Sequence, residues 1–309
     1  MAKENRGYNQ GYVSESALKM EDFMYHRLHE IVNQCELSGK DFFQAVLEED
    51  VSEKSVSETD VMNNMYGMLS AMKAADSSYD GKKSSSGMVG DDTYKYEKYL
   101  KEGEALTGGF IGRVIARALR FGECNACMKR IVAAPTAGSC GVLPAVLLSL
   151  QEERGFSDED VVKALFVAGG IGEIIAQNAS IAGAQGGCQA EIGSASAMAA
   201  GACTYLLGGD AERIANAAAI ALKGLLGLVC DPVAGLVEVP CVKRNVIGAV
   251  NAVTSSELSI AGISSVIPPD EVIDAMDEIG RNMPSIYRET GEGGLAASPT
   301  GKQIEKKLH

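Results

Sequence analysis

The chain has 309 residues, of which 46% are hydrophobic, 22% are charged and 6% are aromatic, with 35 Gly and no Trp. This composition supplies a sizeable apolar core and excludes general disorder. The 41 acidic residues outnumber the 28 basic ones and give a formal net charge of −13. This excess of negative charge repels phosphate backbones, so neither nucleic-acid binding nor a membrane-surface role is supported.

The first hundred residues carry most of the Tyr and many charges. Apolar residues at helical spacing predict an amphipathic helix near 15–36, and a second helix is predicted over 59–76. The polar, Gly/Ser-rich segment 77–93 predicts a loop or hinge before a helix over 94–101. We expect residues 1–100 to form a helical lead-in to a helical domain over 101–309, the two making one structural unit.

From Phe110 onward the apolar periodicity is helical almost throughout. The predicted helices cover 108–131, 141–152, 158–177, 191–207, 210–228, 244–262 and 269–280. The two-residue alternation typical of strands is almost absent. The predicted fold is therefore all-α, a compact multi-helix domain whose Ala- and Gly-rich helices cross at short distances around a buried site.

The compartment is indicated by the absence of targeting signals. The N-terminus reads MAKENRGYNQGY, without an apolar signal region, and the charge-free stretches 174–190 and 192–209 are too short and polar for a membrane span. We therefore expect a cytoplasmic protein. In that compartment the eight Cys are expected to be reduced rather than paired in disulfides.

Four cysteines lie beside Gly or Pro, where helices are expected to break. Cys140 is in AAPTAGSCGVLPA, Cys188 is in GAQGGCQAEIG, and Cys230 and Cys241 bracket CDPVAGLVEVPC. Backbone N–H groups exposed at helix ends favour thiolates, so this setting suits metal ligands. The alternative is that Gly and Pro breaks simply occur often in a chain with 35 Gly.

The other cysteines fit ordinary packing better. Cys35 and Cys203 lie on apolar helical faces, where Cys acts as a small hydrophobic residue. Cys124 and Cys127 form a C-x-x-C, but it lies inside a helical run and no second pair completes a zinc site.

Histidine narrows the choice of metal, because His26, His29 and His309 are the only three and none is near these cysteine segments. His26 and His29 are expected on a solvated helical face. An all-thiolate site points to zinc or iron–sulfur, and the wide spacing of the cysteines disfavours a zinc ribbon. Three thiolates on a four-iron cubane would leave one iron open to substrate.

Four long segments resemble the alpha subunit of iron–sulfur-dependent L-serine dehydratase, an L-serine ammonia-lyase. They read NACMKRIVAAPTAGSCGVLPAVL, NASIAGAQGGCQAEIGSASAMAAGA, CDPVAGLVEVPCVKRNVIGAVNAV and SVIPPDEVIDAMDEIGRNMPSIYRETGEGGLAASPTGK, within about 124–302. A weaker likeness extends upstream through SSSGMVGDD. The resemblance implies an all-α catalytic subunit holding a [4Fe–4S] cluster through Cys188, Cys230 and Cys241, with Cys140 not a ligand.

The resemblance also implies the chemistry. The open iron acts as a Lewis acid on the carboxylate and β-hydroxyl of L-serine, and a base removes the Cα proton. Elimination then gives aminoacrylate, which becomes pyruvate and ammonia without pyridoxal phosphate.

Two departures from single-chain relatives bear on the partner and on the cluster. Such relatives carry an S-S-H-T type segment in an additional N-terminal domain. This sequence has no such segment, which implies a separate beta subunit. That subunit is expected to supply part of the substrate-binding or basic groups. Some relatives close the open iron with a C-terminal Cys, whereas this chain ends QIEKKLH, so His309 is a hypothetical substitute.

Other substrate-binding candidates lie beside these motifs. Ser84, Ser85 and Ser86 precede a predicted helix and offer hydroxyl and N–H groups to a carboxylate, or form an ordinary linker. Lys243 and Arg244 follow Cys241 and can offset cluster or carboxylate charge. Glu191 and Asp231 are left without a role.

Three other functions remain open from sequence. A cysteine desulfidase of the same superfamily would expel sulfide instead of water. A non-catalytic iron–sulfur sensor or scaffold would hold a cluster saturated by four protein ligands, with Cys140 as the candidate fourth. A zinc protein would be colourless.

Overall fold

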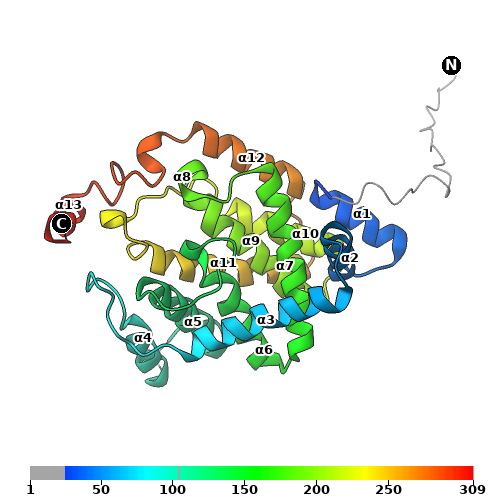
Figure 1. The fold of residues 1–309 in the computed structure, drawn as a ribbon, viewed down its shortest axis with the longest axis horizontal. Coiled ribbons are helices and arrows are strands. Elements are labelled where there is room, and N and C mark those ends of the chain that lie inside the picture. Colours follow the sequence, from blue (N-terminus) through cyan, green and yellow to red (C-terminus); the bar gives the residue numbers. More distant parts are fainter. Residues whose placement is uncertain (1–24, 104, 309) are drawn as a thin grey trace, which may run out of the picture.

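The computed structural model describes residues 25–103 and 105–308, and within these ranges the chain is helical, with no strand. Figure 1 shows the helices gathered around α9. They are α1 (Leu28–Ser38), α2 (Phe42–Lys54), α3 (Glu58–Ser77), α4 (Asp92–Lys101), α5 (Gly108–Ala126), α6 (Val142–Arg154), α7 (Asp158–Asn178), α8 (Gly183–Gly186), α9 (Ser194–Leu206), α10 (Ala211–Lys223), α11 (Cys241–Ile260), α12 (Pro269–Asn282) and α13 (Pro299–Leu308). Among the described helices, none combines the length and apolar character that a bilayer crossing requires.

Helix α9 is the centre of the fold because its sequence, SASAMAAGACTYL, is small and apolar on every side. All of its residues except Tyr205 are buried, as expected for a helix without a polar face. It packs on α6, α7, α10 and α11. A Cβ at Gly201 would lie 2.1 Å from Cδ1 of Ile171 on α7, so the absence of a side chain sets this close approach.

The N-terminal helices share the same apolar core. Leu28 of α1, Phe42 and Val46 of α2 and Leu69 of α3 belong to one buried cluster that continues through α12. Val46 packs against Gly170 of α7, where a Cβ would meet its side chain. The expected division of the chain near residue 100 stays a prediction.

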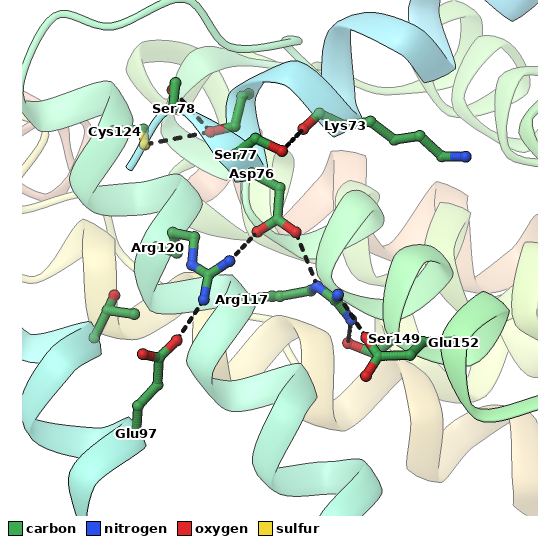
Figure 2. A network of polar contacts seen from close by, with 12 residues as sticks. Lys73, Asp76, Ser77, Ser78, Glu97, Arg117, Arg120, Cys124, Ser149 and Glu152 are labelled. Carbon is green, nitrogen blue, oxygen red and sulfur yellow. Dashed lines mark hydrogen bonds and ion pairs between the residues drawn. The ribbon is translucent and has the colours of Figure 1, made fainter. Parts of the chain in front are cut away.

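A network of ion pairs holds four helices together on one side of the core (Figure 2). Asp76 of α3 accepts from Arg117 and Arg120 of α5, at 3.2 and 2.7 Å. The two guanidinium groups then reach residues of α4 and α6, namely Glu97, Ser149 and Glu152. Because Asp76 and both arginines are mostly buried, this network is less screened than surface pairs are.

The expected loop over 77–93 is anchored by a buried carboxylate. Glu123 of α5 accepts from the backbone N–H groups of Gly90, Asp92 and Thr93 and from the Thr93 hydroxyl. These N–H groups lie at the start of α4, where an anion offsets the positive end of the helix. The segment is therefore irregular but tied to the core.

The all-α prediction is confirmed, and most predicted helices are present with different ends. The helix predicted over 108–131 ends at Ala126, the one over 210–228 ends at Lys223, and the one over 244–262 begins at Cys241. In place of the helix predicted over 15–36 the structure has α1, and residues 15–24 lie outside the described residues. Helices α2, α8 and α13 were not predicted.

Candidate metal and substrate site

Cys188, Cys230 and Cys241 come from three separate segments and meet at one place. Cys188 directly precedes the π-helical turn η2 (Gln189–Gly193), which continues into α9. Cys230 lies in the connection after α10, and Cys241 is the first residue of α11. Cys188 and Cys241 both raise the pKa of Cys230, and Cys188 raises that of Cys241, so the three thiols lie close together.

The backbone before Cys188 requires glycine. Gly187 has φ +73°, and a Cβ there would lie 2.8 Å from the carbonyl oxygen of Leu228. Left-handed backbone disfavours residues with a Cβ, and a backbone carbonyl cannot move aside easily. This glycine therefore fixes how Cys188 enters the site.

Cys230 is held by the chain segment that follows α12. Its N–H donates to the carbonyl of Tyr287 at 2.8 Å, and its carbonyl accepts from the N–H of Glu289 at 2.8 Å. The thiol faces α8, where a Cβ on Gly183 would lie 2.9 Å from Cys230 Sγ and 2.8 Å from Glu191 Oε2. The backbone of α8 thus approaches the thiol as closely as a main chain can.

Arg244 connects the thiols to a buried carboxylate. It lies one turn after Cys241 on α11, and its guanidinium donates to Asp231 Oδ1 and to the carbonyl of Val229, both at 2.8 Å. Asp231 is only 3% exposed and accepts the N–H of Leu295 through its other oxygen. Arg244 also lies beside the Cys188 thiol.

Burial raises the pKa of all three thiols, to about 11 for Cys188 and about 12 for Cys241. The neighbouring thiols and Glu191 raise the pKa of Cys230 and Cys241 further, whereas Arg244 lowers that of Cys188. Three thiolates at this place therefore need a cationic partner beyond Arg244. A metal centre among them would supply that charge.

Glu191 is the carboxylate nearest to the thiols. It accepts from the Thr136 hydroxyl at 2.7 Å, and its Oε2 lies 4.0 Å from Cys230 Sγ. Burial raises the pKa of Glu191 above its usual range, and the charge of Glu289 adds to this. Sequence reasoning left Glu191 unassigned, although its place three residues after Cys188 was a usable signal.

The serine candidates contact a carboxylate next to this site. Ser84 and Ser86 donate their hydroxyls to Glu238 Oε2, at 2.7 and 2.5 Å, while Ser85 is exposed. Glu238 is buried and lies three residues before Cys241. Substrate binding by these serines stays a prediction.

The two cationic candidates lie in different surroundings. Arg244 lies among the thiols, whereas Lys243 is half-exposed and pairs with Asp92 at the start of α4. The guanidinium of Arg244 therefore lies beside the cysteines, whereas the ammonium group of Lys243 lies at the start of α4.

The remaining cysteines lie elsewhere. Cys140 is buried with its thiol 3.6 Å from the carbonyl of Phe121. Cys124 is buried in α5, and Cys127 follows the end of that helix with its thiol 3.2 Å from the carbonyl of Lys82. Cys35 and Cys203 are buried in the core, as predicted. All eight cysteines are free.

The histidines do not contribute to the site in the described part of the chain. His26 and His29 are exposed, as predicted, but His26 lies before α1 and only His29 is on that helix, 2.8 Å from Asp270 of α12. The hypothetical ligand His309 lies outside the described residues. Among residues 25–103 and 105–308, no group of three His, Cys, Asp or Glu is arranged to hold a single metal ion.

Comparisons with known proteins agree with the cysteine segments. The family model described as serine dehydratase alpha chain matches residues 37–296. A probable L-serine dehydratase alpha chain of Bacillus subtilis is 50% identical over 262 residues, which are 84% of this chain and 87% of the relative. The L-serine dehydratase alpha chain of Peptoniphilus asaccharolyticus is 39% identical over 293 residues, which are 92% of this chain and 98% of the relative.

A longer relative matches over a smaller share. The L-serine dehydratase of Streptomyces coelicolor is 47% identical over 183 residues, which are 59% of this chain and 40% of the relative. The alpha-chain relatives are thus covered almost end to end, whereas more than half of this longer one has no counterpart here.

Proposed function

Because the chain belongs to the serine dehydratase alpha-chain family, we propose that it is the catalytic alpha subunit of an L-serine ammonia-lyase that releases pyruvate and ammonia. The observation that carries the proposal is the meeting of Cys188, Cys230 and Cys241 beside Arg244 within the matched region. The names of the alpha-chain relatives supply the substrate.

The three thiols are the proposed ligands of a [4Fe–4S] cluster. Their donor set suits iron–sulfur chemistry, and the absence of a side chain at Gly183 lets the backbone of α8 lie directly beside Cys230. In a four-iron cluster each thiolate binds its own iron, so the sulfurs stand farther apart than the ligands of one ion. When bound, the cluster supplies a Lewis-acidic iron for the substrate hydroxyl and carboxylate.

The residues around the proposed cluster site have separate roles. Arg244 places a guanidinium among buried thiols, which offsets their charge and holds Cys188 next to the start of α9. Thr136 orients the Glu191 carboxylate through its hydroxyl. Ser84, Ser85 and Ser86 remain proposed binding groups for the substrate carboxylate, and Lys243 a proposed source of positive charge nearby.

A beta subunit is the proposed partner, and it is proposed to supply the base that removes the Cα proton. The longer Streptomyces coelicolor relative supports this, because the chain covers only 40% of it whereas it covers 98% of an alpha-chain relative. We also propose a cytoplasmic location, since eight free cysteines suit a reducing compartment.

The test is anaerobic reconstitution with iron and sulfide, with and without the beta chain, followed by absorbance and pyruvate release from L-serine. We expect a brown protein that forms pyruvate only with the partner. The Cys241→Ser variant should lose iron and activity, while the matched Cys203→Ser variant, altered in the core of α9, should keep both.

Other outcomes would overturn parts of this assignment. Sulfide release from L-cysteine without pyruvate from L-serine would indicate a desulfidase. A brown complex inactive on both substrates would indicate a non-catalytic cluster protein. A colourless chain that binds no iron would contradict the cluster and the mechanism together.

A further inference from the structure

A pocket lies behind α8 as seen from the cysteines. Its volume is about 550 Å³, within the range of small-molecule sites, and residues of α7, α8, α12 and the segment after α12 line it. Ala184, Gln185 and Gly186 of α8 face this pocket, whereas Gly183 abuts Cys230 and Glu191. None of the three cysteines lines it, so it is separate from the proposed cluster site.

The pocket contains a cation without a counter-charge. In the part of the chain that the structure describes, Arg288 has no carboxylate partner, and its Nε is buried without a hydrogen bond. Its Nη1 makes one long contact, 3.4 Å, with the carbonyl of Gln185. The other lining arginine, Arg281, is paired with Asp277 at 2.8 Å. Arg288 therefore gives the pocket one uncompensated positive charge.

The main chain holds Arg288 in place independently of its side chain. The N–H of Arg288 donates to the carbonyl of Ser285, and the residues on either side of it are bonded to the backbone of Cys230. The guanidinium is thus presented from a fixed backbone. A preformed guanidinium recognises carboxylates well, because its paired N–H groups match the two carboxylate oxygens.

From this geometry we propose that the pocket behind α8 binds a small monocarboxylate of the hydroxy- or keto-acid class, with Arg288 as its anchor. One unpaired cation matches one carboxylate, and the hydroxyl groups of Ser285 and Thr290 in the lining suit a polar remainder. Pyruvate is the probe, since it belongs to this class and is the product of the proposed reaction. The binding claim itself does not depend on turnover.

The test is calorimetric titration of pyruvate into the iron-loaded full chain under anaerobic conditions. The wild type should bind pyruvate at a site whose affinity falls at least about tenfold in Arg288→Met, the loss expected for a hydrogen-bonded charge. Arg288→Lys should fall less. Ala184→Phe should also weaken binding, because its ring takes up space in the pocket while Arg288 is retained.

Controls separate this pocket from the cysteine site and from general anion binding. Arg213→Met, on α10 and outside this pocket, should bind like the wild type. Binding lost in Cys241→Ser but kept in Arg288→Met would place pyruvate at the cluster and overturn the proposal. Equal binding of inorganic phosphate or of ethyl pyruvate would also overturn it, since the site would then not select a carboxylate. If the protein binds pyruvate through Arg288 but does not turn over L-serine, the result counts only against the proposed function.

Discussion

Replacing Arg244 by Met should destabilise the chain more than replacing any exposed arginine. The substitution leaves Asp231, 3% exposed, with the N–H of Leu295 as a remaining hydrogen-bond donor and without the guanidinium at 2.8 Å. Two opposite charges about 4 Å apart at an effective dielectric constant of 20 attract by about 4 kcal/mol, and breaking a buried pair costs about 3–5 kcal/mol. We therefore expect the free energy of unfolding to fall by about 3–5 kcal/mol.

The assay is urea unfolding followed by far-UV circular dichroism, for Arg244→Met, Asp231→Leu and the double variant. Because each single variant leaves one buried group unpaired, the double variant should cost less than the sum of the two, by at least about 1 kcal/mol. The matched control is Arg213→Met, because the pair of Arg213 with Asp210 is about half-exposed. This substitution should lower the free energy of unfolding by less than about 1 kcal/mol. If Arg244→Met unfolds like Arg213→Met, the reasoning about this buried pair is wrong.

The remaining predictions use residues around and away from the site. Burial raises the pKa of Glu49, which is 6% exposed, from 4.5 to about 7. The free energy of unfolding should therefore fall as the pH rises from about 4.5 to 7. In thermal unfolding, Glu49→Gln should be more stable than the wild type at pH 8, by up to about 3 kcal/mol, and equal to it near pH 4.5. Gly187→Ala should lower iron content, measured by iron analysis, because its Cβ meets the Leu228 carbonyl. Ser86→Ala should lower stability in urea by about 1–3 kcal/mol through loss of its bond to Glu238. Ser85→Ala should leave stability unchanged and raise KM for L-serine if this loop binds substrate; unchanged KM would contradict that role.

Helix ends were hard to predict because apolar residues continue beyond them. Ile131 and Val132 follow α5, and Leu225 and Leu228 follow α10, yet these side chains pack against the core from irregular backbone. Helix α2 was missed because its sequence, FFQAVLEEDVSEK, crowds apolar residues into its first half and has little helical periodicity. It packs against α7 and is capped at its start by Asp41.

The cysteines were recognisable from sequence because Gly and Pro next to them mark breaks in helices. Their neighbours were not, since the contacts are long-range: Thr136 reaches Glu191 across 55 residues, and Asp231 reaches Leu295 across 64. Local spacing carries no information about such pairs. The family resemblance proposed Cys188, Cys230 and Cys241 as ligands, and the fold shows which charges surround them.

The segment after α12 connects the pocket behind α8 with the cysteine site. Its backbone pairs with Cys230, Arg288 lines the pocket behind α8, and the charge of Glu289 acts on Cys230 and Glu191. Glu289 also has φ +65°, a conformation that costs a residue with a Cβ on the order of 1–3 kcal/mol and persists only where the surroundings enforce it. The two backbone bonds to Cys230 enforce it here. Consecutive residues of this turn therefore serve both places: Arg288 lines the pocket behind α8, and Glu289 brings a carboxylate near the thiols.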